Sequence, residues 1–111
     1  MRDVIYIDDF IDAMLSAAVK IDSYDPINVG SGKGFSVREI LDTLLVIVDH
    51  RRARIVYDQS KPSMIPIMLV GTRKAESVLG FRARTSLRQG LEKTMNWYRE
   101  SHLRLQEKQY S

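Results

Sequence analysis

The most informative stretch of this sequence is Met1-Arg2-Asp3-Val4-Ile5-Tyr6-Ile7-Asp8-Asp9. The β-branched and aromatic residues at positions 4–7 predict a short strand. The two aspartates at its end predict a cap and a favourable first-turn charge for a helix that ends near Lys20. Arg2 precedes both elements, and a cation held where a strand leads into a helix is suited to an anionic ligand. Arg2 is therefore the first candidate binding residue.

The composition indicates one small globular domain. Of the 111 residues, 44% are hydrophobic and 28% are charged, which fits one modest core rather than two domains or a disordered chain. No apolar run approaches the roughly 18 to 20 residues of a membrane span. Asp8, Asp9 and Asp12 argue against a secretory signal, so we expect a cytoplasmic location and no membrane partner. Because cysteine is absent, disulfides and thiolate metal sites are excluded.

The charge pattern does not indicate a nucleic-acid or metal partner. Seventeen Lys and Arg against 14 Asp and Glu leave a net charge of +3, which favours anionic partners only weakly. The one basic cluster, at positions 51–54, has no interleaved aromatic residue for base stacking, and we expect a solvated loop there. His50 and His102 lie far apart in the sequence, so no metal site is predicted and both are expected on the surface.

Further short strands are expected beyond the first helix. Residues 27–29 and 54–57 are rich in β-branched residues, and residues 67–70 are expected to form a short extended piece. Between positions 58 and 66 the prolines predict a loop.

Three more helices are expected from their end signals. Ser36-Val37-Arg38-Glu39 matches a capping box and opens a helix with a continuous apolar stripe. A short helix over 73–79 is expected to end at Gly80, and Thr85 or Ser86 is expected to cap the last helix. The predicted fold class is therefore α/β: a small domain of short strands and about four helices, with the long helices packed on the strands.

The motif Gly30-x-Gly32-x-Gly34 lies between a predicted strand and a predicted helix, as a dinucleotide-binding fingerprint would. Its spacing is wrong, because that fingerprint needs a glycine or alanine at position 35, which is Phe35. Two interpretations remain open. The glycines form a strand-to-helix turn, or the backbone N–H groups there help to hold a phosphate or a ribose.

No self-contained catalytic constellation is predicted. Tyr57 and Lys61 have the Tyr-x-x-x-Lys spacing, but Tyr57 ends a predicted strand and Lys61 precedes a proline, so the two side chains would not share a helical face. Asp8 and Asp9 fit capping and dipole roles better than acid and base roles. The sequence also lacks a Ser-His-Asp or Cys-His arrangement.

Taken in order, several motifs resemble the C-terminal portion of the extended short-chain dehydrogenases/reductases, the NAD-dependent nucleotide-sugar epimerase/dehydratase family. They are Arg2-Asp3-Val4-Ile5-Tyr6-Ile7-Asp8-Asp9, Ile27-Asn28-Val29-Gly30-Ser31-Gly32, Ser36-Val37-Arg38-Glu39, Tyr57-Asp58-x-Ser60-Lys61-Pro62, Lys74-Ala75 with Leu79-Gly80-Phe81, and Thr85-Ser86-Leu87 through Gly90-Leu91 to Trp97-Tyr98. The Asp-x-Ser-Lys-Pro segment is most similar to the GDP-fucose synthase and UDP-glucose 4-epimerase subfamilies. The resemblance implies a nucleotide-sugar-binding domain at residues 1–101, followed by a polar tail at 102–111.

The resemblance assigns substrate binding to two residues. Arg2 corresponds to the arginine that contacts the diphosphate of the nucleotide sugar, and Lys61 to a lysine that also reaches the substrate. In the family, NAD or NADP and the catalytic residues belong to the N-terminal Rossmann half, which this sequence does not contain, so we expect no cofactor and no catalytic residue in this chain. Where the family has one or two basic residues after a proline, this sequence has Ile67 and Met68, so binding is expected to be weak.

Two functions are compatible with these features. The first is the substrate-binding part of an NAD(P)-dependent epimerase, dehydratase or reductase, not catalytic alone. The second is a non-catalytic interaction module that associates with itself. In either case the opening strand and residues 44–48 would expose edge groups and apolar surface, so we expect a homo-oligomer, with an exchanged strand or helix as one route.

Overall fold

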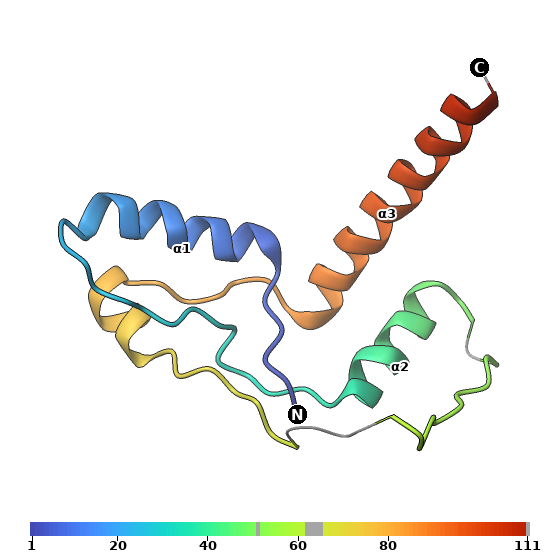
Figure 1. Cartoon of the computed structure of the whole chain (residues 1–111), viewed down its shortest axis with the longest axis horizontal. Helices are drawn as coiled ribbons and strands as arrows, with labels where there is room; N and C mark the ends of the chain where they lie inside the picture. The colour runs from blue at the N-terminus through green and yellow to red at the C-terminus, as the bar shows by residue number, and fades with distance from the viewer. Residues whose placement is uncertain (51, 62–65, 111) are drawn as a thin grey trace.

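The computed structural model describes residues 1–50, 52–61 and 66–110, and in that part of the chain it contains three α-helices and one short π-helix. Arg51 of the basic cluster and Pro62 of the Ser-Lys-Pro motif lie outside the described residues. In chain order the helices are α1 (Ile7–Lys20), α2 (Val37–Ile47), η1 (Ala75–Leu79) and α3 (Leu87–Tyr110) (Figure 1). Of the four helices that were expected, three are α-helices and the fourth, η1, is a five-residue π-helix, while α3 continues through most of the tail. No described helix combines the length and the hydropathy that crossing a membrane requires.

The predicted strands do not assemble into a sheet in the described residues. The opening segment makes isolated bridges only, one antiparallel between Arg2 and Phe35 and one parallel between Arg2 and Met68. The Arg2 amide donates to the Phe35 carbonyl at 2.7 Å, and the Phe35 amide donates back at 2.8 Å. On the other side the Asp3 amide donates to the Met68 carbonyl at 3.2 Å. The α/β prediction was therefore wrong in this respect, because runs of three or four residues find too few neighbours to extend a ladder.

Capping residues define two of the helix starts as the sequence predicted. The Ser36 hydroxyl accepts from the Glu39 amide at 3.0 Å, and the Glu39 carboxylate accepts from the Ser36 amide at 3.0 Å, so the capping box is complete. Ser86 and Gln89 make the same reciprocal pair before α3, at 3.1 and 3.2 Å. Gly80 ends η1 with a φ of 64°, the left-handed conformation that favours glycine.

The start of α1 differs from its prediction. Tyr6 occupies the cap position and makes no side-chain cap bond. Asp8 and Asp9 lie inside the first turn, where their charge suits the helix dipole but neither side chain acts as the cap.

Helices pack on helices rather than on strands. α1 contacts η1 on one side of the molecule, and α2 contacts α3 on the other (Figure 1). Ala13 of α1 is buried with Ala75 and Leu79 of η1. The Ser16 hydroxyl and the Lys20 ammonium both donate to the Leu79 carbonyl, at 3.2 and 2.7 Å, so the C-terminal carbonyl of η1 is satisfied by α1.

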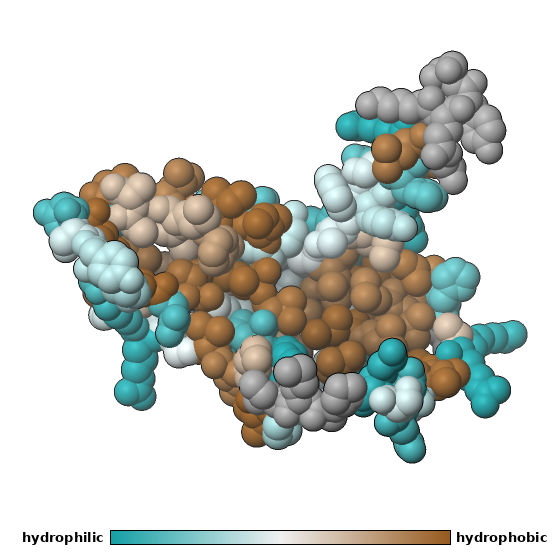
Figure 2. All heavy atoms as spheres, viewed as in Figure 1, coloured by the Kyte–Doolittle hydropathy of each residue, from teal (hydrophilic) through white to brown (hydrophobic). Residues whose placement is uncertain are grey.

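The fold is unusually open for its mass. Its accessible surface is 9315 Å², whereas a compact monomer of this size exposes about 6300 Å². The radius of gyration is 17.6 Å, compared with roughly 13 Å for a compact domain of this length. Figure 2 shows apolar side chains gathered over α1 and over the region between α2 and the start of α3. The chain therefore leaves a large apolar area uncovered.

Gly30 is a position where the packing requires glycine, because a Cβ there would lie 2.6 Å from the Asp3 carboxylate and 2.9 Å from Val70 Cβ. We expect Gly30→Ala to lower the free energy of unfolding by about 2 kcal/mol, since overpacking forces backbone and side chains apart. Gly71→Ala is the matched control, because a methyl group added there would have no neighbour within 4 Å. Urea denaturation at one protein concentration measures both. Equal stabilities for the two variants would contradict the prediction.

Candidate functional site

Arg2 takes part in both of the bridges that form among the described residues. Its backbone is fixed on both sides by the bridges to Phe35 and Met68, and its guanidinium Nη1 donates to the Met1 carbonyl at 3.2 Å. The terminal ammonium of Met1 donates to the Pro66 carbonyl at 2.6 Å, which secures the beginning of the segment. The arginine is thus half-buried on an anchored backbone, which is the arrangement expected of a preorganised residue that binds an anion.

The residues that replace the expected basic side chains lie next to Arg2. Met68 is its parallel bridge partner, and Ile67 precedes Met68 on the same extended segment. Their exposed fractions are 60% for Ile67 and 49% for Met68. A basic side chain at either position would therefore reach solvent from the segment that is bridged to Arg2. Neither Ile67 nor Met68 carries a charge, so the contribution of this segment to anion binding stays a prediction.

Lys61 is presented by a small turn built from its own motif. The Asp58 carboxylate accepts from the Ser60 hydroxyl at 2.5 Å and from the Ser60 amide at 3.0 Å. These bonds, the hydroxyl first, lower the pKa of the exposed Asp58 carboxyl below its usual range. The Lys61 amide completes the turn by donating to the Asp58 carbonyl at 3.4 Å, and its side chain is exposed. Arg2 and Lys61 thus come from separate segments, and their joint use stays a prediction.

The glycine-rich turn is held by Asp3. The amide of Ser31 donates to Asp3 Oδ1 at 2.7 Å, its hydroxyl donates to the same oxygen at 2.6 Å, and the amide of Gly32 donates to Oδ2 at 3.3 Å. The N–H groups that a phosphate would need are therefore bound to a carboxylate of the same chain. A pyrophosphate of NAD or NADP does not fit this turn, and the structural interpretation of the glycines is the one that the geometry supports.

The Tyr57–Lys61 spacing does not form a catalytic pair here. Residues 53–57 belong to neither a helix nor a strand, and the Tyr57 hydroxyl accepts from Arg38 Nη1 at 2.8 Å. Arg38 also forms an ion pair with Asp42 at 3.0 Å on α2. The Tyr57 hydroxyl is therefore bonded to a side chain of α2.

Asp9 has a structural role that the sequence did not reveal. Its side chain is buried, with 5% of the residue exposed, and its Oδ2 accepts from the Thr85 amide at 2.9 Å. Asp8, its neighbour, is exposed. The two aspartates therefore do not face one another as an acid and base pair, and Asp9 connects α1 to the segment that leads into α3.

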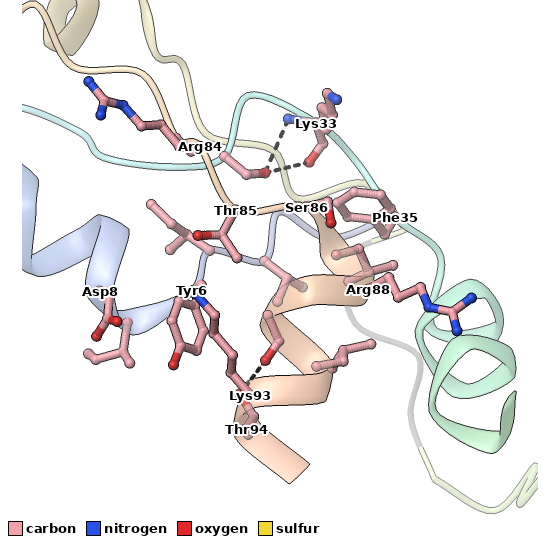
Figure 3. A pocket seen from close by; sticks show the side chains of 18 of the residues that line it. Tyr6, Asp8, Lys33, Phe35, Arg84, Thr85, Ser86, Arg88, Lys93 and Thr94 are labelled. Atoms are coloured by element: carbon pink, nitrogen blue, oxygen red, sulfur yellow. Dashed lines mark hydrogen bonds between the residues drawn. The ribbon is translucent and has the colours of Figure 1, made fainter. Parts of the chain in front are cut away.

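A large open cavity lies apart from both predicted binding residues. Its volume is about 1030 Å³, and it is bounded by the opening segment, the glycine-rich turn and the first half of α3 (Figure 3). Neither Arg2 nor Lys61 lines it. Lys93 lies over the Tyr6 ring at 5.4 Å from the centroid, while Arg84 and Arg88 point outward from the apolar centre. No sequence signal could have located this cavity, because its walls come from residues that are far apart in the chain.

The histidines are consistent with surface roles. His50 is exposed just after α2, and the exposed His102 ring stacks on Tyr98 with 5.8 Å between centroids. Within the described part of the chain no group of three or more His, Cys, Asp or Glu side chains is placed to hold a metal ion.

The chain has clear relatives among characterised protein families. It is 30% identical over 101 residues to a putative GDP-L-fucose synthase 2 of Arabidopsis thaliana, an alignment that covers 91% of this chain and 30% of the relative. It is 31% identical over 110 residues to the GDP-L-fucose synthase of Escherichia coli, covering 91% of this chain and 34% of that protein. A putative UDP-glucose 4-epimerase of Methanocaldococcus jannaschii is 29% identical over 104 residues, covering 91% and 32%.

These relatives are much longer than the chain, which spans about a third of their length. No family model matches the sequence, and no solved structure matches the fold.

Proposed function

Because the chain belongs to the NAD-dependent nucleotide-sugar epimerase/dehydratase family of extended short-chain dehydrogenases/reductases, we propose that it binds the diphosphate of a nucleotide sugar through Arg2 and Lys61. In this proposal the chain supplies substrate binding and is not catalytic alone. The observation that carries it is the anchored backbone of Arg2, with the Ile67 and Met68 segment bridged beside it.

The chemistry of the two side chains supports this ligand. A guanidinium fork can donate two parallel N–H groups to phosphate oxygens, and an ammonium on a flexible stem adds a movable point charge. The fixed backbone reduces the conformational entropy that Arg2 loses when a ligand binds. Affinity is limited because Ile67 contributes no charge where the family has a basic residue.

Isothermal titration with GDP- and UDP-sugars tests the proposal. We expect Ile67→Arg to strengthen binding by roughly 10- to 100-fold, because one charge-assisted hydrogen bond to a desolvated phosphate contributes about 1.5 to 3 kcal/mol. Arg2→Ala is expected to remove most of the binding in the Ile67→Arg background. Val56→Arg is the matched control, since Val56 is 77% exposed and its replacement adds the same charge on a different segment.

Two results would contradict the diphosphate site. One is the absence of binding heat at millimolar nucleotide sugar for both the wild type and Ile67→Arg. The other is an equal gain from Ile67→Arg and Val56→Arg, which would indicate a general effect of positive charge.

The second candidate function is a self-associating interaction module, and the open fold favours it specifically. The chain exposes about 3000 Å² more than a compact monomer of its mass. A stable protein interface needs about 800 Å² from each partner. Self-association would therefore cover surface that the isolated chain leaves in water.

A further inference from the structure

The Asp3 carboxylate joins the segment that carries Arg2 to the glycine-rich turn. Its Oδ1 accepts from the amide and the hydroxyl of Ser31 at 2.7 and 2.6 Å, and its Oδ2 accepts from the Gly32 amide at 3.3 Å. The Ser31 hydroxyl is itself held in place, because the Lys33 amide donates to it at 3.2 Å. The carboxylate is therefore bound to a turn whose donors are already fixed.

The space beside this carboxylate is closed. A Cβ at Gly30 would lie 2.6 Å from Asp3 Oδ2 and 3.1 Å from the carboxyl carbon. Asp3 is also half-buried. Its side chain thus has one well-defined place, and the glycine at position 30 is what makes that place available.

The backbone alone specifies the pairing of the opening segment only weakly. Arg2 forms one bridge to Phe35 and one to Met68, and neither bridge continues into a ladder. A slip of one residue in an extended pairing turns every side chain to the opposite face. Because neighbouring side chains of an extended segment lie on opposite faces, a fixed Asp3 also fixes the face on which Arg2 lies.

The charge of Asp3 by itself would oppose an anionic ligand at Arg2. A carboxylate repels a phosphate, and a unit charge about 7 Å away in water costs roughly threefold in affinity. In this chain the carboxylate is turned toward the donors of Ser31 and Gly32. Its place beside Arg2 is therefore accounted for by geometry and not by charge.

We propose that Asp3 is a positioning residue of the diphosphate site, and that its bonds to the glycine-rich turn hold Arg2 on the face from which it meets the ligand. This role rests on the proposed function and deepens it. It gives the glycine-rich turn a part in substrate binding without any contact between the turn and the phosphate.

Isothermal titration with GDP- and UDP-sugars in the Ile67→Arg background tests this role. Asp3→Asn is expected to raise the dissociation constant at least roughly fivefold, although it removes a negative charge beside the ligand. The reason is that the amide has one acceptor oxygen where the carboxylate has two, so Ser31 and Gly32 are no longer both bound. Asp22→Asn is the matched control, since it removes the same charge from an exposed loop, and it is expected to change affinity by less than roughly twofold.

A second pair of variants moves the carboxylate without changing any charge. Gly30→Ala places a methyl group in the space that Asp3 Oδ2 occupies, and it is expected to raise the dissociation constant at least roughly threefold. Gly71→Ala adds the same methyl group where no atom lies within 4 Å, and its affinity is expected to equal that of the parent.

Destabilisation alone is distinguished from positioning by the folded fraction. An unfolded fraction raises the apparent dissociation constant only by the reciprocal of the folded fraction, so a variant that circular dichroism shows to be about nine-tenths folded would lose almost no affinity from this cause. Amide hydrogen exchange followed by NMR is the second measurement. The amides of Arg2 and Phe35, which donate to one another's carbonyls, are expected to exchange faster in Asp3→Asn, whereas amides within α1 are expected to keep their protection.

The possible failures are distinguishable. If Asp3→Asn binds as tightly as Asp22→Asn or more tightly, the positioning role is overturned and the proposed function stands. Equal affinities for Gly30→Ala and Gly71→Ala would have the same meaning. Absence of binding by both the wild type and Ile67→Arg would overturn the proposed function and the positioning role together.

Discussion

Asp3→Ala is expected to lower the free energy of unfolding by about 3 kcal/mol, because it removes the acceptor for charge-assisted bonds in a partly buried position. The Asp3 carboxylate accepts from the amide and hydroxyl of Ser31 and from the amide of Gly32. Without it, these donors must find water inside the turn, and the opening segment loses its side-chain connection to the segment that precedes α2. Urea denaturation at a fixed protein concentration measures the change.

Asp22→Ala serves as the control for this substitution. Asp22 is an exposed aspartate in the loop after α1, and its replacement is expected to change stability by less than about 0.5 kcal/mol. If Asp3→Ala and Asp22→Ala had similar unfolding midpoints, the stability of the glycine-rich turn would not depend on the Asp3 carboxylate.

Asp9→Ala is expected to lower the free energy of unfolding by about 2 to 3 kcal/mol. The buried carboxylate accepts a hydrogen bond from the Thr85 amide, and its negative charge in the first turn of α1 interacts favourably with the helix dipole. The substitution leaves a part-buried N–H without its acceptor and separates α1 from the segment before α3. Thermal and urea unfolding, both followed by circular dichroism, measure the loss.

The adjacent residue provides a matched control for Asp9. Asp8→Ala removes the same charge from the same helical turn, but Asp8 is exposed, so the expected cost is at most about 1 kcal/mol from the dipole. Comparable losses for the two variants would show that the first-turn charge matters and the bond to Thr85 does not.

The helices could be predicted because their signals are local. The capping box at Ser36 and Glu39 and the glycine stop at Gly80 need only residues within one or two turns, and the structure has both. The strands could not be predicted with the same success. A run such as 54–57 becomes a strand only if another backbone pairs with it, and among the described residues only single bridges at Arg2 form.

The same contrast between local signals and long-range contacts applies to the candidate site. The motifs of the sequence predict Arg2 and Lys61 as binding residues, and they mark Ile67 as a position where the resemblance leads one to expect a basic residue. They give no indication that Met68 is the bridge partner of Arg2, because the two are 66 positions apart in the chain.

The sequence by itself determined the family, the capping box of α2 and the glycine end of η1, since each depends on residue identity at short spacing. Only the tertiary structure decided that Asp3 occupies the N–H groups of the glycine-rich turn and that Asp9 is a buried anchor between α1 and the segment before α3. These features arise when distant segments meet. Contact between distant segments depends on packing, and packing is not encoded in any local pattern.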